Sequence, residues 1–445
     1  MRNLTQGPVR GHILQLSSFI ALTTFFQTLY FLVDLYFVGR LGKEAVAGVG
    51  LAGNLMMIVL ALTQALGVGA TSLLAQAMGR RDTGGAERVF NQALVLSVLT
   101  GTAYGAVLFA LRGPYSRWLA ADAATAAESI SYLNWFVPAM ALQFTMVAMG
   151  AALRGIGDLR IPTLISIATV VANMILTPLL IFGVGTGRPL GVAGASLASF
   201  IALGGGLVAF TSYFRRRDSV LRFRPADWPP RPGLWWQMLR VGLPVGGEFM
   251  LMTIYMVLVY DIIRPFGSAA QAGFGIGVRV VQALFLPSVA IGFATAPVAA
   301  QNFGAKLGGR VRESFYAAAT MSAVVMAVLT AVCQVAPSTV VRFFNDDPAV
   351  VDFGSEYLRI ISWSFVASGL IFVSSSVFQG MGHTLPALAS SALRLVLFAA
   401  PAYALSRQAA FQMRHVWYIA LATAFVQVGT TLWLLHREFD RKLAF

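Results

Sequence analysis

Long apolar stretches separated by short polar gaps follow one another along the whole chain. About twelve of them reach ~17 residues, the length that a membrane-spanning helix needs. Backbone amides in lipid must find their partners inside the protein, so runs of this length are predicted to be helices. The expected spans are 13–38, 46–76, 89–111, 127–153, 161–183, 191–214, 237–263, 271–299, 314–336, 353–379, 386–406 and 415–436.

The sharpest break in this pattern is RRRDSVLRFRPADWPPRPG, a charged and proline-rich stretch that begins at Arg215. Its tryptophans suit the edge of a membrane. The break predicts an N-terminal six-helix lobe over 1–214, a cytoplasmic linker over 215–235 and a C-terminal six-helix lobe over 236–445.

The two predicted lobes repeat one another. RLGKEAVAGVG is similar to PFGSAAQAGFG, and LRGIGDLRIP is similar to FQGMGHTLP, with the blocks in the same order. An even number of spans per half keeps both halves in the same orientation, so we expect an all-α membrane protein with two pseudo-twofold-related lobes around a central cleft. The paired residues lie 224 or 225 positions apart: Gly42 with Gly267, Gln76 with Gln301, Gly155 with Gly380 and Ser199 with Thr423.

Composition agrees with a polytopic membrane protein. Of the 445 residues 57% are hydrophobic and 11% are charged, and the mean hydropathy is +0.73. The net charge of +14 lies in the gaps between spans, so it indicates topology and not nucleic-acid binding. Lys and Arg are more frequent on the side of the two termini, which predicts cytoplasmic termini in a bacterial inner membrane. Cys333 is the only cysteine, which excludes an internal disulfide.

Three acidic residues fall inside the predicted spans, Asp34, Glu248 and Asp261. A charged Asp at a helix centre costs about 2.5–3.5 kcal/mol on insertion scales, so such a residue indicates function. Asp34 is the most isolated of the three, and a buried carboxyl can bind a proton and a cation in turn. Asp261 lies near a span end, three residues before Arg264, and is expected to form a local ion pair with it.

Several motifs resemble the multidrug and toxic compound extrusion (MATE) family. VDLYFVGRLG around Asp34 is similar to its VD-x4-GR-x-G signature, and LRGIGDLRIP, AQNFGA and LTPLLIFG followed by GVAGASLAS are similar to three more blocks. The resemblance implies a multidrug efflux antiporter, not an enzyme, that exports organic cations or drugs in exchange for H⁺ or Na⁺. It implies no cofactor beyond that coupling ion, lipids and small molecules as partners, and a monomer.

The resemblance also implies a coupling-ion site in the N-terminal lobe. Asp34 matches the family's acid on helix one, and Tyr30 lies one turn before it. Asn173 matches an Asn on helix five, Thr177 stands where some members carry a second Asp, and Ser199 matches a hydroxyl on helix six. One carboxylate with neutral oxygens favours H⁺, while Na⁺ at Asp34 stays open. Helix one has no proline, so a proline-driven bend of some members cannot operate here.

Substrate-cleft candidates are Glu248, Gln143 and Arg279. Some branches of the family place a cation-binding Glu on helix seven, at the position that Met252 holds here. Glu248 is therefore expected either to contact substrate or to form an ion pair with Arg279 or Arg394.

Three other classes of membrane protein are less well supported. A membrane enzyme needs grouped catalytic side chains, whereas the four histidines are scattered and there is no phosphate-binding loop. A lipid-linked oligosaccharide flippase of the same superfamily is expected to have more helices and a more cationic cleft. A channel would not need the duplicated lobes.

Overall fold

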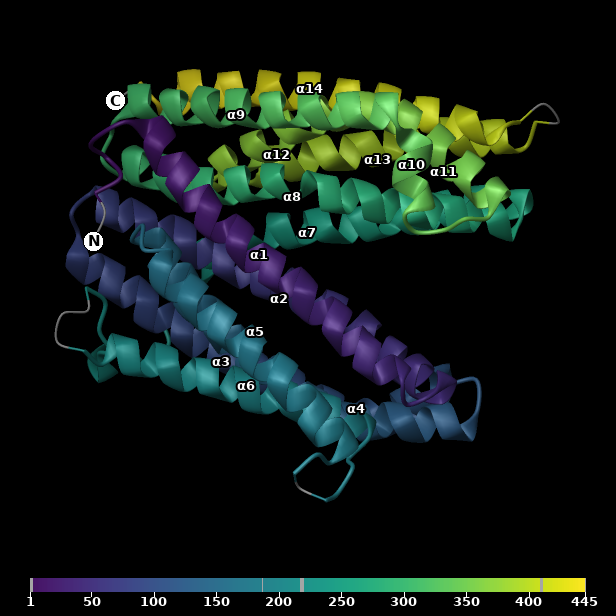
Figure 1. Ribbon diagram of the computed structural model, residues 1–445. Coiled ribbons are helices and arrows are strands. Elements are labelled where there is room, and N and C mark those ends of the chain that lie inside the picture. Colours follow the sequence, from purple (N-terminus) through teal and green to yellow (C-terminus); the bar gives the residue numbers. More distant parts are fainter. Residues whose placement is uncertain (1–2, 186, 217–219, 409–410, 445) are drawn as a thin grey trace. The chain divides into compact units, whose positions relative to one another are not determined.

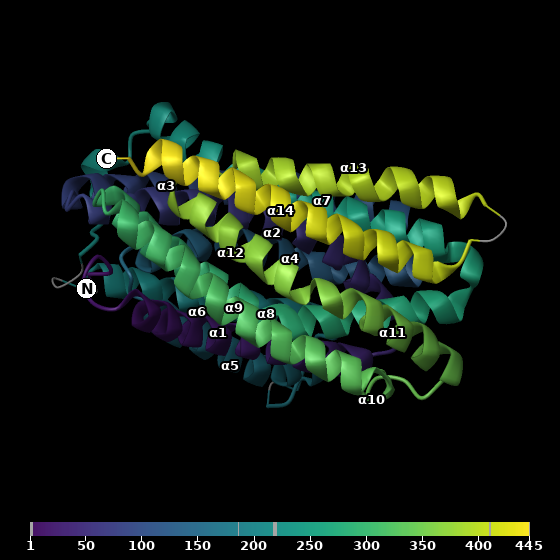
Figure 2. The same ribbon diagram turned by 90° about the horizontal axis from the view of Figure 1, so that it is seen from above.

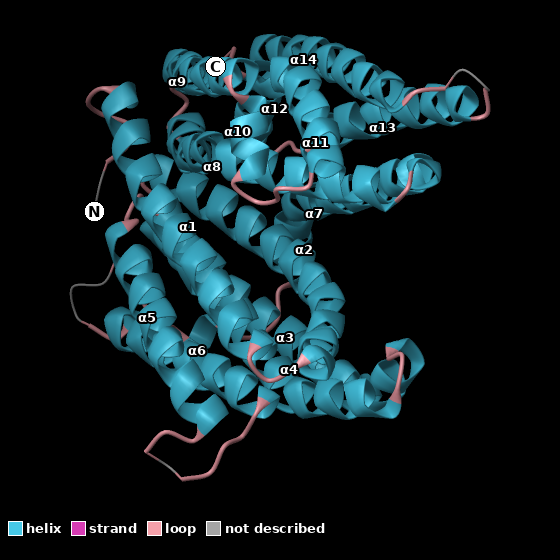
Figure 3. Ribbon diagram, turned by 45° about the vertical axis from the view of Figure 1, so that its right-hand side comes forward, coloured by secondary structure: helices cyan, strands magenta, loops and turns pink. Residues whose placement is uncertain are grey.

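The computed structural model describes residues 3–185, 187–216, 220–408 and 411–444. All regular structure in these residues is helical (Figure 3). Within the described ranges, twelve helical stretches are long and apolar enough to cross a membrane, which confirms the predicted class. Most of the helices are longer than the predicted apolar runs; the third predicted span, 89–111, lies inside a helix of 37 residues.

The chain divides into two compact units. The N-terminal unit is built on Phe19–Leu243, and the C-terminal unit on Pro244–Phe445 together with Leu4–Ser18. The helices of the N-terminal unit are α1(Val9–Gly39), α2(Lys43–Gly79), α3(Thr83–Leu119), α4(Ala123–Gly155), α5(Arg160–Phe182), α6(Val192–Phe214) and η1(Pro225–Asp227) (Figure 1). Within it α4 is central, because it packs against α2, α3 and α6.

The C-terminal unit has the same helix order with one span divided. The tenth span, Pro348–Gly380, consists of α11, η3 and α12, and a short helix, α10, precedes it. Helices α13 and α14 pack side by side (Figure 2). The helices are α7(Pro232–Ile263), η2(Arg264–Phe266), α8(Ser268–Gly304), α9(Gly308–Val335), α10(Pro337–Arg342), α11(Pro348–Ile361), η3(Ser362–Ser364), α12(Phe365–Gly380), α13(Leu385–Ser406) and α14(Met413–Lys442).

Aspartate side chains cap the N-termini of several of these helices. The Asp82 carboxylate accepts the Gly85 amide at 2.7 Å before α3, and the Asp122 carboxylate accepts the Thr125 amide at 2.7 Å before α4. These bonds satisfy amides that the first turn of a helix leaves free. The Thr125 amide also holds the pKa of Asp122 below its usual range.

The duplication is visible in the packing. Phe90 packs on Phe214 with ring centroids 4.5 Å apart, and Phe315 packs on Phe439 at 6.0 Å. Each residue of the second pair lies 225 positions after its counterpart. Equivalent helices are thus held by equivalent aromatic contacts.

Two glycines make the same close helix contact in each unit. A Cβ on Gly155 would lie 3.1 Å from the Thr71 carbonyl oxygen, and one on Gly380 would lie 2.8 Å from that of Ala296. Only glycine lets the two backbones approach this closely. This contact explains why both glycines stand in the repeated blocks.

Helices α1 and α7 each take part in both units. The boundary falls between Ser18 and Phe19 in α1, and between Leu243 and Pro244 in α7, positions that are 225 residues apart. In the C-terminal unit, the amide of Leu4 donates to Gln301 Oε1 at 3.2 Å.

The linker after α6 is bound to the N-terminal unit by two fully buried amides of α3, Asn91 and Gln92. Asn91 donates to the Arg222 carbonyl at 2.9 Å and accepts the Trp228 indole N–H at 3.1 Å. Gln92 donates to the Pro229 carbonyl at 2.8 Å. The described part of the linker is therefore packed against α3 by several hydrogen bonds.

Hydroxyl side chains line the middle of α1. Ser17, Ser18, Thr23, Thr24 and Thr28 each donate to a backbone carbonyl three or four residues earlier in the helix. Such bonds compete with the helix's own hydrogen bonds. They surround the point at which α1 passes from one unit to the other.

Candidate functional site

Asp34 lies in α1, five residues before the end of the helix. Its Oδ1 atom is buried and accepts no hydrogen bond from any described residue. An ionised carboxylate in apolar surroundings without a partner is strongly disfavoured. The group is therefore suited to bind a proton or a cation.

The four neutral residues predicted for this site form one hydrogen-bonded chain. The hydroxyls of Tyr30 and Ser199 lie 3.1 Å apart, and Asn173 Nδ2 donates to Ser199 Oγ at 3.0 Å. Thr177 in turn donates to Asn173 Oδ1 at 3.0 Å. The structure therefore brings together the four side chains, from α1, α5 and α6, that the family resemblance assigned to one site.

Asp34 lies one turn after Tyr30 in α1 and makes no hydrogen bond to it, but the two groups are near enough to interact electrostatically. The interior of the chain is closed to solvent, because Asn173, Thr177 and Ser199 are all at least 94% buried. No charged residue of the described structure forms an ion pair with Asp34. The carboxyl is consequently the only charged member of the cluster.

Tyr132 is a further buried tyrosine near Asp34 that sequence reasoning did not select. It lies in α4, is 5% exposed and interacts electrostatically with both Asp34 and Tyr30. Its ring stacks on Phe136 with centroids 5.2 Å apart. Nothing in the local sequence separates this tyrosine from one that serves packing alone.

The donor set fits a proton or a single monovalent cation. Among the described residues, no three His, Cys, Asp or Glu side chains come together in a way that could hold a metal ion. A sodium ion here would have Asp34 and neutral oxygens such as those of Tyr30 and Asn173 as ligands.

Glu248 has a different environment, in the C-terminal unit. Ser375 Oγ on α12 donates to its two carboxylate oxygens at 3.5 and 3.3 Å. The alternative of an ion pair with Arg279 or Arg394 is not realised in the described structure. Arg394 instead contacts Tyr255, which lies seven residues after Glu248, about 10 Å further along α7.

The other cleft candidates are not part of these clusters. Arg279 is exposed on α8, and Gln143 is half-buried in α4. Neither makes a hydrogen bond to Asp34 or Glu248 in the described residues, and their contact with substrate remains a prediction. Met252, at the position of other members' helix-seven acid, is 46% exposed.

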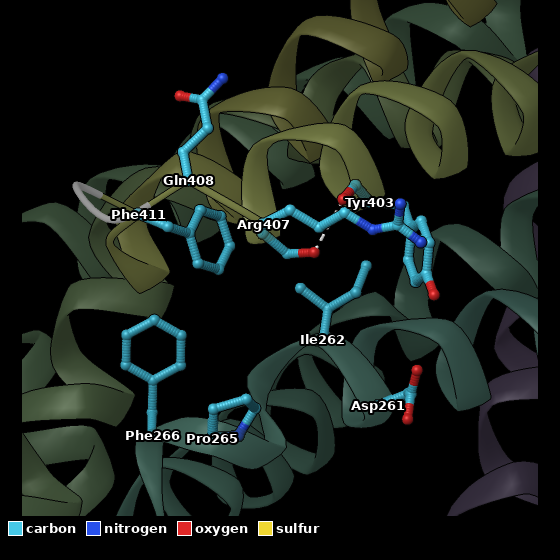
Figure 4. A pocket seen from close by; sticks show the side chains of 9 residues that line it. Asp261, Ile262, Pro265, Phe266, Tyr403, Arg407, Gln408 and Phe411 are labelled. Carbon is cyan, nitrogen blue, oxygen red and sulfur yellow. Dashed lines mark hydrogen bonds between the residues drawn. The ribbon is translucent and has the colours of Figure 1, made fainter.

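A pocket lies at the end of α7 and α13 (Figure 4). Asp261, Tyr403 and Arg407 stand on one side of it, and Phe266 and Phe411 on the other. The expected ion pair between Asp261 and Arg264 was wrong. Asp261 lines this pocket and Arg264 does not, and the α-helix ends between them, at Ile263.

Known proteins resemble the chain over most of its length. The MatE family model matches residues 20–179 and again 244–404. "Multidrug export protein MepA" of Staphylococcus haemolyticus is 24% identical over 382 residues, 84% of this chain and 82% of that protein. "Probable multidrug resistance protein YoeA" of Bacillus subtilis is 25% identical over 373 residues, 82% and 80% of the two chains.

The fold also matches a solved structure. It is described as the outward-facing conformation of a multidrug resistance MATE family transporter of the MOP superfamily. The TM-score is 0.90 at 24% identity, covering 99% of this chain and 98% of that one.

Twelve apolar helices in two related units, with an isolated buried acid, define a polytopic membrane transporter. The family match extends over most of both units, so the chain belongs to the MatE family of multidrug and toxic compound extrusion (MATE) transporters and is not an enzyme. The two matched segments begin 224 residues apart, which confirms the internal duplication.

Proposed function

We propose that the chain is an antiporter that exports organic cations or drugs in exchange for H⁺, with Asp34 as the shared binding group. The ionised carboxylate attracts a cationic cargo molecule, and the protonated carboxyl is neutral and releases it. A single group that binds either partner, but not both at once, couples their movements in opposite directions.

The observation that carries this proposal is the unpartnered Oδ1 of Asp34 beside a fully neutral hydrogen-bonded chain. An acid kept for packing would be expected to have its oxygens satisfied by donors. Tyr30, Asn173, Thr177 and Ser199 bond mainly to one another and leave the carboxyl free for an exchangeable partner.

Proton coupling fits this site better than sodium coupling. Thr177 occupies the position of a second acid in some relatives, so the site has one negative charge. Sodium prefers several hard oxygen ligands, and here they would all be neutral except one. Na⁺ remains the alternative that the experiment below separates.

We place the transporter in the bacterial cytoplasmic membrane as a monomer, with both termini in the cytoplasm. The excess of Lys and Arg on the terminal side of the loops supports this orientation. The internal duplication supports an alternating-access mechanism.

The test is dye efflux from bacteria that lack their own exporters. Wild-type protein should lower dye accumulation, and collapse of the proton gradient should abolish this effect while collapse of the sodium gradient leaves it. Asp34→Asn should reduce uphill efflux to background, because the amide cannot exchange a proton for a cation.

A matched control is Asp352→Asn, at an exposed acid on α11. This variant should transport like the wild type. Uphill efflux retained by a folded Asp34→Asn protein would exclude the role of Asp34, and loss of efflux only when the sodium gradient collapses would exclude proton coupling.

A further inference from the structure

The pocket of the C-terminal unit that contains Asp261 and Arg407 lies where two spanning helices end (Figure 4). Asp261 is two residues before the end of α7, and Arg407 directly follows the last residue of α13. These helices are the seventh and the eleventh of the twelve spans, so both ends lie on the same side of the membrane. The volume of the pocket is about 440 Å³, within the usual range for a small-molecule site.

The position of Arg407 along its span corresponds to the level of the lipid headgroups. Helix α13 has 22 residues, and at 1.5 Å per residue its length is about 33 Å, close to the ~30 Å of the hydrocarbon core of a bilayer. We therefore expect Arg407 at the boundary between acyl chains and phosphates. Tyr403, one turn earlier, suits the aromatic belt at this boundary.

The pocket contains one acid and one base that do not pair with each other. Among the described residues, no cationic nitrogen lies within 4.0 Å of the Asp261 carboxylate, and no carboxylate oxygen lies within 4.0 Å of the Arg407 guanidinium. Arg407 instead lies over the Tyr403 ring, 4.7 Å from its centroid. A ring under the guanidinium plane leaves the N–H groups at the edge of that plane available to an anion. A ligand with one anionic and one cationic group can therefore contact both side chains.

Apolar side chains form the opposite side of the pocket. Phe266 and Phe411 pack with ring centroids 5.7 Å apart, and Pro265 stands beside Phe266 (Figure 4). Both phenyl rings stand away from Asp261, so they do not form an aromatic cage around a cation at its carboxylate. A cation there is held by hydrogen bonds, which favours an ammonium group with N–H donors over a quaternary one.

Exposed apolar faces lead from the pocket along both helices. Val257 lies one turn before Asp261 on the same face of α7, and its side chain is 64% exposed. Val396 lies two turns before Tyr403 on α13, and its side chain is 63% exposed. The acyl chains of a lipid would cover such faces, whereas a small soluble molecule in the pocket would leave them bare.

The two charges of the pocket have no counterparts in the N-terminal unit. The residue 225 positions before Asp261 is Tyr36, and the residue 225 positions before Arg407 is Phe182. Helix ends of the repeated architecture therefore do not require an acid and a base at these positions.

We propose that this pocket binds the headgroup of a phospholipid that has a primary ammonium group, a phosphatidylethanolamine. Arg407 contacts the phosphate, and Asp261 contacts the ammonium group. The ammonium donates hydrogen bonds to a carboxylate, which the trimethylated headgroup of a phosphatidylcholine cannot do. This proposal does not depend on the coupling role of Asp34.

The experiment is native mass spectrometry of the purified full-length protein in detergent, titrated with one dioleoyl phospholipid at a time. It measures the dissociation constant of the first bound lipid for phosphatidylethanolamine and for phosphatidylcholine. The wild type should bind phosphatidylethanolamine about threefold to tenfold more tightly, as expected for one charge-assisted contact in a half-open pocket.

Two variants separate the roles of the two charges. Asp261→Asn should bind both lipids equally, with the dissociation constant of phosphatidylcholine unchanged. Arg407→Gln should weaken the binding of both lipids by about threefold to tenfold, because both have a phosphate. The matched controls are Asp352→Asn and Arg437→Gln, which change an exposed acid of α11 and an exposed arginine of α14 and should bind like the wild type.

Glycerophosphoethanolamine, the same headgroup without acyl chains, separates a lipid site from a site for a soluble molecule. At equal concentration it should not displace phosphatidylethanolamine. The proposal is overturned if the wild type binds phosphatidylethanolamine no more tightly than phosphatidylcholine, if folded Asp261→Asn protein keeps the preference, or if the chain-free headgroup competes as well as the lipid.

Discussion

At the scale of single residues, the hydrogen-bonded side chains of the candidate site are neutral, and its one ionisable acid stands outside their hydrogen bonds. Tyr30, Asn173, Thr177 and Ser199 satisfy one another, and Asp34 beside them has an unpartnered oxygen. None of the hydrogen bonds that join the four neutral side chains involves the acid. We therefore expect these bonds to persist when the proposed proton exchange changes the charge of Asp34.

In this arrangement the Tyr30 hydroxyl contributes to the stability of the folded protein. Tyr30→Phe removes its contact with Ser199 and should lower stability by about 1 kcal/mol, the usual net value of one hydrogen bond. The melting temperature in detergent should fall by a few degrees. Tyr36→Phe on the same helix is the control, since Tyr36 is 56% exposed and accepts from Arg40 at the surface. Equal melting temperatures for the two variants would contradict the role given to Tyr30.

Much of this site could be predicted from the sequence, because its residues lie in motifs that resemble those of the family. The family resemblance assigned Asp34, Asn173 and Ser199 to one site, and in the structure Asn173 and Tyr30 both bond to Ser199, while Asp34 lies one turn after Tyr30 without a hydrogen bond to it. Tyr132 and Ser375 were not found, because a tyrosine or a serine in an apolar helix usually serves packing. Their importance arises from helices distant in sequence, which no local pattern encodes.

At the scale of elements, the loop after α4 and the loop after α12 are held by different side-chain contacts, one to α6 and the other to α14. Tyr213 at the end of α6 donates to Asp158 Oδ2 at 3.5 Å. The residues 225 positions later are Glu438 and His383, whose Oε2 and Nδ1 atoms lie 3.1 Å apart. The contact is present in both units, but its chemistry differs. Glu438 stands in place of Tyr213, and His383 stands in place of Asp158. An imidazole titrates near neutral pH.

The pH dependence of the His383 contact follows from its pKa. Burial holds the pKa of His383 below its usual value of 6.5, and the Lys442 ammonium acts in the same direction against the opposing effect of Glu438. Between the folded and unfolded pKa the unfolded chain binds more protons, so this contribution to stability is complete above about pH 6.5 and is lost on acidification.

His383→Gln should therefore flatten the acid side of the stability profile. On lowering the pH from about 7.5 to about 5.5, its melting temperature should fall less than that of the wild type. His436→Gln, at an exposed histidine of α14, should behave like the wild type. A wild-type slope in the His383 variant would show that the loop contact does not titrate in this range.

At the scale of the whole molecule, the boundary between the units does not coincide with the boundary between the repeats. Ser18 and Leu243 are each the last residue before a change of unit, and both lie inside helices. The apolar pattern predicted twelve helices and the duplication, since both depend on helix length and local sequence. It could not predict that α1 and α7 begin in the opposite unit, because that depends on which surface each helix start covers.

Separate halves should consequently be unstable. A fragment of residues 1–216 lacks the carbonyls of Arg222 and Pro229 that Asn91 and Gln92 hold, and it leaves Leu4 without Gln301. Burying unsatisfied amides costs about 1–3 kcal/mol each. Expressed alone, this fragment should aggregate on size exclusion in detergent, and coexpression with residues 217–445 should restore a single peak. A monodisperse fragment 1–216 would contradict this expectation.

The hydroxyls along α1 have a consequence for how that helix deforms. Relatives with a proline in this helix have one fixed weak point, whereas α1 has none. Five Ser and Thr hydroxyls instead share backbone carbonyls with the main chain from Ser17 to Thr28. Each shared carbonyl slightly weakens one backbone hydrogen bond of the helix. We therefore expect any bending of α1 to be spread over about three turns and not concentrated at one residue, so that no single substitution in this segment should abolish it.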